Sequence, residues 1–302
     1  MDKYFNQLDK AIDRMVSGKE KELLKVYKKS LKELRGKISE QYSKYAIGEQ
    51  LTFAEMSKYG RNERLFREIQ GEINNLYRTA GVETRRLASN AYEESYYRTA
   101  FALEKGTQAK LSYTQIPREQ IKAAVQMPLS GLTLNDRLSR NRQNLITRMR
   151  EQITQGLVQG EGYVSMTKRV KEQFDKDAAG TMRILRTEGG RMQSLGTVES
   201  MEHANELGII TMRVWNSAID GRTRDDHIDM DGKKIKPGEL FTLPDGSRAE
   251  APGLSGEASQ DINCRCTMTQ EIAGYEPEFR RVRGEGVIPQ TTFIEWKSER
   301  LG

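Results

Sequence analysis

The chain has 302 residues, of which 36% are hydrophobic and 30% are charged. Globular proteins usually contain roughly 45–50% apolar residues, so this composition favours an elongated, mostly helical protein over one thick globule. The net charge of +6 comes from 49 basic and 43 acidic residues, without the concentrated basic face of a dedicated nucleic-acid binder. No signal peptide is visible and no apolar run reaches about 18 residues, which argues against secretion and against a transmembrane helix.

Residues 2 to about 106 are predicted to be helical almost throughout. Apolar residues recur at three- and four-residue steps, as in Leu65, Ile69, Ile73 and Leu76. Thr52 followed by Glu55 is a capping-box pattern, which predicts that a helix begins near Phe53. Breaks between the helices are predicted at the glycines of this region, namely Gly18, Gly36, Gly48, Gly60, Gly71 and Gly81.

Further helices are predicted after a connecting segment. Residues 106–135 contain two prolines and are typical of a connection, and helix resumes from about 134 to 157. Apolar residues at four-residue steps then predict a helix over 165–177, and a longer helix is expected over 178–207. Gly208 suits the position just after a helix end, and it predicts the boundary with the next domain.

Beyond Gly208 the pattern becomes that of short strands. Residues 209–215 alternate in type, and three Asp-Gly turn signals follow. The sequence therefore predicts a mainly α protein with long N-terminal helices, a helical bundle and a small C-terminal α/β or β-rich module. The predicted domains are a helical arm (1–130), a helical bundle (131–208), a compact module (209–275) and a tail (276–302).

The predicted C-terminal module gathers the rarest side chains of the chain. His227, one of two histidines, and both cysteines, Cys264 and Cys266, lie within it. These residues offer three zinc ligands, but a closed structural site needs four and Cys-x-Cys is a tight spacing. His203 or an aspartate is the candidate for the fourth ligand. We expect packed thiols, a locally hydrogen-bonded His227 and no cofactor, with structural zinc as the alternative.

Two arginines of the module, Arg222 and Arg224, require anionic partners. They follow the Asp-Gly turn predicted at Asp220, and a forked guanidinium pairs with carboxylates or with phosphate. We expect Arg222, Arg224 and His227 to form a polar lattice with nearby aspartates, while Trp215 anchors the module's core. Phosphate binding is the other interpretation of the two arginines.

The order of these motifs resembles that of the phage minor head protein family, the Mu F-like head morphogenesis proteins of tailed bacteriophages. The resemblance spans roughly Leu134 to Tyr275. The matching residues, in chain order, are Arg186-Thr187-Glu188, Trp215, Asp220-Gly221-Arg222-Thr223-Arg224, His227, Asp231-Gly232 and Asn263-Cys264-Arg265-Cys266.

The resemblance implies a structural role in the virion. Members of the family join the procapsid in few copies and associate with the portal, and some are linked to DNA packaging or ejection. It therefore implies binding to the portal and to other head or scaffolding proteins, with viral DNA as a further partner and no membrane contact. The implied location is the capsid interior, after assembly in the host cytoplasm. Toxin domains are fused to some relatives, but we expect none in the short segment after Tyr275.

Two rival functions remain open from the residues. One is a metal-dependent nuclease or phosphotransfer enzyme, with His227 as general base beside a metal held by Asp225, Asp229 or Asp231. The other is a DNA-binding virion protein, whose affinity would fall steeply with salt. Its candidate phosphate contacts are Lys168, Arg169, Lys171, Arg280, Arg281 and Arg283.

Overall fold

The computed structural model of the chain describes residues 2–272, 279–282 and 286–289. It confirms the predicted fold class, because long helices are followed by a small C-terminal β-rich module. Within these ranges, no helix is long and apolar enough to cross a membrane.

The chain divides into two compact units, each assembled from separate stretches of sequence. The first unit combines Met1–Ser17, Arg85–Thr133 and Leu185–Gly302, and the second combines Gly18–Thr84 and Leu134–Ile184. Three long helices contribute residues to both units: α1 (Asp2–Tyr45), α3 (Arg61–Thr107) and α6 (Tyr163–Glu206). The units differ from the predicted linear division at residues 130, 208 and 275, because each long helix belongs to different units at its two ends.

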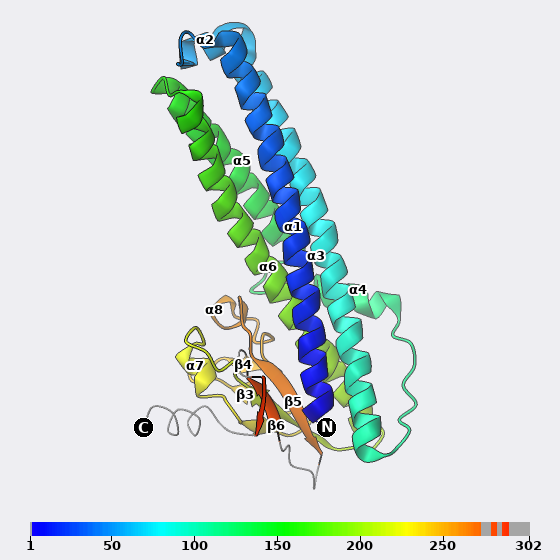
Figure 1. The fold of residues 1–302 in the computed structure, drawn as a ribbon. Helices are drawn as coiled ribbons and strands as arrows, with labels where there is room; N and C mark the ends of the chain where they lie inside the picture. The colour runs from blue at the N-terminus through cyan, green and yellow to red at the C-terminus, as the bar shows by residue number, and fades with distance from the viewer. Residues whose placement is uncertain (1, 273–278, 283–285, 290–302) are drawn as a thin grey trace. The chain divides into compact units, whose positions relative to one another are not determined.

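The second unit is a bundle in which α1, α3 and α6 lie beside α5 (Leu134–Val158) (Figure 1). The short helix α2 (Phe53–Ser57) and the 3-10 turn η1 (Lys58–Gly60) connect α1 to α3. The predicted start of α2 is confirmed, since the Thr52 hydroxyl accepts a hydrogen bond from the backbone N–H of Glu55.

A buried polar cluster ties three helices of the second unit together. The hydroxyls of Tyr27 on α1 and Tyr77 on α3 donate to the Asp177 carboxylate on α6, at 2.7 and 2.8 Å. The Thr181 hydroxyl lies 2.8 Å from that of Tyr27. Burial raises the pKa of Asp177, and the hydrogen bonds from the two tyrosines oppose that effect.

Of the six helix breaks predicted at glycines, four are wrong. Gly48 and Gly60 lie between helices and have positive φ, whereas the other four lie inside α1 and α3. A glycine costs a helix only about 1 kcal/mol relative to alanine, and the buried apolar faces of these helices offset that cost. The predicted break near residue 177 is also wrong, because α6 continues through it and through Gly189 and Gly190.

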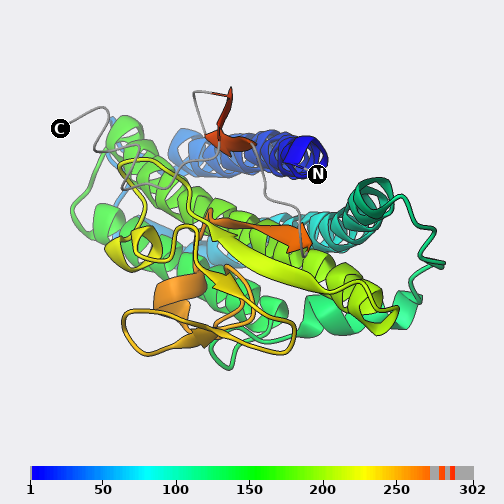
Figure 2. The ribbon, with the colours of Figure 1, turned by 90° about the horizontal axis from the view of Figure 1, so that it is seen from below.

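The first unit contains the C-terminal module and one helix that the sequence did not predict, α4 (Arg118–Gln126). The central sheet of the module is antiparallel, with β1 (Thr211–Asn216) between β2 (Lys234–Ile235) and β5 (Thr267–Ile272). Figure 2 shows β1 and β5 against the C-terminal part of α6, where Val198 and Met201 pack on Ala251 and Met268. The predicted helix end at Gly208 is confirmed, since α6 ends at Glu206 and Gly208 has a φ of 89°.

Short elements complete the first unit. They are α7 (Asp225–Ile228), the paired strands β3 (Phe241–Thr242) and β4 (Arg248–Ala249), α8 (Ala258–Asp261), and the paired strands β6 (Phe279–Val282) and β7 (Gly286–Pro289). The last pair lies within the predicted tail, whose other residues are outside the described ranges.

Candidate functional site

Trp215, on β1, lies at the centre of the module's hydrophobic core. Its side chain is buried and packs with the residues Met230, Ile235, Phe241, Leu243, Ala249 and Cys266. The indole ring makes edge-on contacts with the rings of His227, at 5.5 Å between centroids, and Phe241, at 5.2 Å. The core therefore presents one edge of the His227 imidazole to the Cys-x-Cys segment.

His227 and the two cysteines converge on one point beside this core. The Nδ1 atom of His227 lies 3.5 Å from the Cys264 sulfur and 3.4 Å from the Cys266 sulfur. His227 and Cys266 are buried, whereas Cys264 is half-buried. Among the described residues, these three form the group of potential metal ligands, with ligand atoms within 4.8 Å of one another.

Gln260, on α8, orients the imidazole of His227. The amide nitrogen of Gln260 donates to the carboxylates of Asp226 and Asp245, at 2.9 and 2.6 Å. Its amide oxygen therefore faces the Nε2 atom of His227, at 2.9 Å, and accepts a hydrogen bond from it. This arrangement leaves the lone pair of Nδ1 directed at the two sulfurs. Sequence reasoning missed Gln260, because no spacing rule connects a glutamine to a histidine 33 residues away.

Arg265 separates the two cysteines and points away from them. Residues two apart in an extended segment share a face, so both sulfurs lie on one side and Arg265 on the other. Its guanidinium forms an ion pair with Asp220, with Nη2 2.7 Å from Oδ1. That hydrogen-bonded pair lowers the pKa of Asp220 to about 2.

The two arginines predicted to pair with aspartates behave differently from that prediction. The side chain of Arg222 is 76% exposed and reaches Asp220 only at 3.9 Å. Arg224 donates instead to backbone carbonyls, those of Gln260 at 3.3 Å and Ile262 at 2.6 Å. The positive charge of Arg224 thus lies beside Cys264.

The two thiols interact strongly with each other. The hydrogen bond between them raises the pKa of Cys264 and lowers the pKa of Cys266, and the backbone hydrogen bond at Ala218 also lowers the pKa of Cys266.

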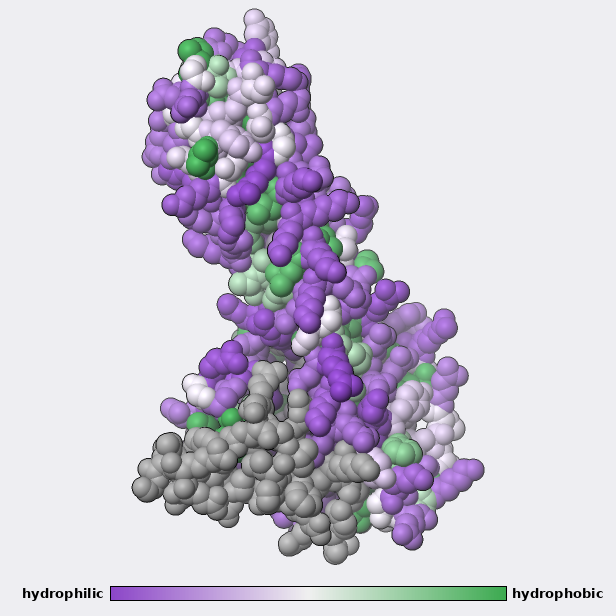
Figure 3. Space-filling view, in the orientation of Figure 1, coloured by the Kyte–Doolittle hydropathy of each residue, from purple (hydrophilic) through white to green (hydrophobic). Residues whose placement is uncertain are grey.

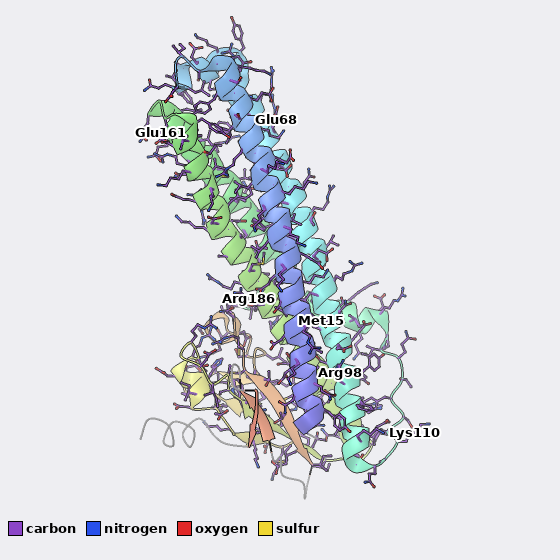
Figure 4. The ribbon with its side chains drawn as sticks, viewed as in Figure 1. Met15, Glu68, Arg98, Lys110, Glu161 and Arg186 are labelled. Atoms are coloured by element: carbon purple, nitrogen blue, oxygen red, sulfur yellow. The ribbon has the colours of Figure 1, made fainter. Side chains whose placement is uncertain are left out.

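Two of the remaining motif residues form hydrogen bonds within the module. Asp231 accepts a hydrogen bond from the Ser217 backbone at 2.8 Å, and Gly232 donates its backbone N–H to the Trp215 carbonyl at 2.8 Å. Gly232 has a φ of 75°, which a side chain would disfavour. Arg186 is exposed on α6 (Figure 4).

Two buried arginines that the sequence did not single out form ion pairs with residues of α6. Glu188, a motif residue, pairs within α6 with Arg191 at 3.3 Å, and both side chains are buried. Arg213 on β1 is buried as well and pairs with Glu202 of α6 at 2.8 Å, which links the module to this helix. An arginine in the middle of a predicted strand was the available signal for the second pair.

The aspartates predicted for a nuclease and the histidine predicted as a fourth zinc ligand are not part of the metal-ligand group around His227 among the described residues. The metal-ligand group around His227 contains no aspartate within the described part of the chain, in contrast to the predicted nuclease arrangement. The proposed fourth ligand, His203, instead contacts the Leu111 carbonyl at 3.3 Å and the Tyr113 ring.

The candidate DNA contacts do not form one described surface. Arg169 is bound by Glu161 and by neighbouring glutamines, and Lys171 pairs with Asp175, whereas Lys168 is exposed. Arg280 and Arg281 lie in β6, and their side chains are outside the described part, as is all of Arg283.

Comparison with known proteins gives a consistent family. Residues 147–269 match the family model described as Phage Mu protein F like protein. The chain is 34% identical to the minor head protein GP7 of Bacillus phage SPP1, over 97% of this chain and 96% of that protein. It is 30% identical to the NAD(+)–arginine ADP-ribosyltransferase EFV of Enterococcus faecalis, over 93% of this chain but only 57% of that protein. No solved structure matches. The near full-length identity to GP7, together with the Mu F-like motif region, shows that the chain belongs to the phage minor head protein family.

Proposed function

We propose that the chain is a minor head protein of a tailed bacteriophage that binds other head proteins, including the portal, in the capsid interior. Through this binding it assists head assembly and the packaging or ejection of DNA. The observation that carries the proposal is the 34% identity to a minor head protein over almost the whole of both chains. Such coverage means that the helical regions, and not only the Mu F-like module, correspond.

The second unit offers a surface for such binding. The helical surface is mostly hydrophilic with isolated hydrophobic residues (Figure 3). At the turns that join the helices of this unit, Ile47, Tyr59, Val158 and Val164 are 68–87% exposed. We call these four residues the tip surface. We infer that these four exposed apolar side chains contact other head proteins.

The turns that carry the tip surface are held together within the second unit. Gln50 forms backbone bridges with Ile47, after α1, and with Gly162, between α5 and α6. Arg61 lies over the rings of Tyr45 and Tyr59, with centroid distances of 3.8 and 5.3 Å. Figure 4 marks Glu161 at the same turn between α5 and α6. A partner can therefore meet preformed turns, which limits the ordering cost of binding.

We infer that the role is binding and not catalysis. The relative named as an ADP-ribosyltransferase is matched over 57% of its length, so its printed activity describes a longer protein. The motif residues described above are used in core packing, ion pairs and backbone hydrogen bonds, which supports a structural role for the module.

The test is incorporation of tip variants into procapsids assembled from co-expressed coat, scaffolding and portal proteins of the phage. We expect Ile47→Asp/Val164→Asp to lower incorporation and portal co-purification about tenfold or more, because desolvating a carboxylate opposes docking. Val82→Asp, on α3 of the same unit and 49% exposed, is the matched control and should be incorporated normally. Absence of the wild-type chain from procapsids would refute the head role, and equal incorporation of all variants would refute the tip surface.

A further inference from the structure

We propose that His227, Cys264 and Cys266 bind one zinc ion, with water as the fourth ligand, and that this ion cross-links the C-terminal module. The ligand atoms are Nδ1 of His227 and the two sulfurs. This inference concerns the module itself and does not rest on the proposed role in the phage head.

The distances from Nδ1 of His227 to the two sulfurs fit tetrahedral coordination of one zinc ion. Zinc lies about 2.0–2.1 Å from histidine nitrogen and about 2.3 Å from cysteine sulfur, so a tetrahedral angle separates nitrogen and sulfur by about 3.5 Å. The two observed separations from Nδ1 are 3.5 and 3.4 Å. A neutral imidazole has a single lone pair on Nδ1, which accepts only one thiol proton. A shared cation explains two nearly equal distances better than one hydrogen bond does.

The hydrogen bonds around His227 favour the tautomer that carries its proton on Nε2 and can bind a metal through Nδ1. Asp226 and Asp245 fix the Gln260 amide, whose oxygen accepts a hydrogen bond from the Nε2–H group of His227. A metal-bound histidine usually donates its second ring N–H to a fixed hydrogen-bond acceptor, which increases the basicity of the nitrogen that binds the metal. Gln260 is therefore a positioning residue.

The charges around the sulfurs suit a thiolate-bound ion. Arg224 places a positive charge beside Cys264, and the Ala218 backbone N–H donates to Cys266. Binding of Zn²⁺ displaces one proton from each thiol, and the two resulting thiolates neutralise the ion. Sulfur and imidazole ligands favour zinc over magnesium or calcium, which prefer oxygen.

A metal ion at this position would cross-link two parts of the module that are far apart in sequence. His227 lies on the four-residue helix α7, and the cysteines lie 37 and 39 residues later, before β5. The chain between them contains two-residue strands, β2, β3 and β4, and short turns. Such a segment contains little regular secondary structure, and small metal sites commonly stabilise folds of this kind.

The experiment measures metal in the reduced, tag-free, full-length chain by elemental mass spectrometry. We expect about one zinc per chain, removal by a chelator, and recovery on adding Zn²⁺ alone. With Co²⁺ as the probe, we expect a sulfur-to-cobalt charge-transfer band and intense tetrahedral d–d bands. Cys264→Ser/Cys266→Ser should lose both the zinc and the charge-transfer band, whereas His203→Ala, the histidine control, should retain them.

A graded variant keeps the test independent of folding. Gln260→Ala retains all three ligands, and we expect its zinc affinity to fall about 10–100-fold while the cobalt spectrum persists. The proposal is overturned if the well-folded reduced chain takes up neither Zn²⁺ nor Co²⁺. It is also overturned if zinc binds without a sulfur-to-cobalt band in the wild type, because the metal would then lie elsewhere. Normal assembly of a zinc-free variant would leave the head role intact.

Discussion

Asp220 and Arg265 join the turn after β1 to the Cys-x-Cys segment across 45 residues. The ion pair lowers the pKa of Asp220 to about 2, below its ordinary value of about 3.9. A carboxyl group with a lowered folded-state pKa stabilises the protein above its unfolded-state pKa, and this contribution is lost as the pH falls through the folded-state pKa. The contribution is therefore present at neutral pH and disappears between about pH 4 and pH 2.

We expect Asp220→Asn to lower the free energy of unfolding at pH 7 by about 1–2 kcal/mol, after allowance for the partial exposure of the pair. The difference from wild type should shrink towards pH 2. Urea unfolding across this pH range measures it. Arg265→Gln should have a similar effect, and the double variant should add little, because both changes remove one interaction. A difference that stays constant with pH would contradict the assigned ion pair.

Residue identities were easier to predict from the sequence than residue partners. The scarcity of histidine and cysteine picked out His227, Cys264 and Cys266 as a group, and the structure places their ligand atoms together. The partners of the charged residues did not follow from proximity in sequence. Asp220 pairs mainly with Arg265, because the fold brings these two side chains together. Its contact with Arg222, two residues away in sequence, is longer.

Glycines inside α6 illustrate how elements pack in the first unit. A Cβ atom added at Gly196 would lie 2.3 Å from the Tyr92 carbonyl oxygen on α3, and at Gly189 it would lie 2.7 Å from a Val16 methyl group on α1. Gly196 allows the backbones of α6 and α3 to approach closely, and Gly189 makes room for a side chain of α1. The sequence alone does not show whether a glycine breaks a helix or lies inside one, and for this reason the four breaks in α1 and α3 were predicted wrongly.

We expect Gly196→Ala to destabilise the chain by about 1–3 kcal/mol, because the backbone of α3 must move to accommodate the methyl group. Gly36→Ala is the matched control: Gly36 lies inside α1 with no atom within 4 Å of the added Cβ. This substitution should stabilise the chain by about 0.5–1 kcal/mol through helix propensity. Thermal and urea unfolding of both variants test the contrast. Equal effects of the two substitutions would show that the helices do not approach at Gly196 as described.

At the scale of the whole molecule, the two compact units are not consecutive segments of sequence, because three helices are long enough to contribute residues to both. The sequence predicted that long helices precede short strands, and it placed the module after Gly208. It could not reveal that α1, α3 and α6 each serve two units, because a helical repeat does not indicate which residues along the helix share a core. The module is therefore part of a unit that also contains the C-terminal half of α6 and the N-terminal residues of α1.

We expect the segment 209–275 to lack a fixed tertiary structure when it is produced alone, even with added zinc. In the full chain, Ala251 and Met268 pack on Val198 and Met201 of α6. The Asn263 backbone also donates to the Thr187 hydroxyl at 2.9 Å, and Ser194 donates to the Pro252 carbonyl at 2.7 Å. Without α6 these apolar surfaces and carbonyls face water, and a zinc ion would restrain only the segment near His227.

The near-ultraviolet circular dichroism of Trp215 provides the measurement, since a buried, immobilised indole gives a strong signal. The isolated segment should show little signal and poor dispersion of its amide proton resonances, whereas the full chain should show both features of a packed core. A cooperative thermal transition in the isolated segment would contradict this expectation. It would mean that the core around Trp215 and the metal ligands suffices for folding, with α6 serving only as an attachment.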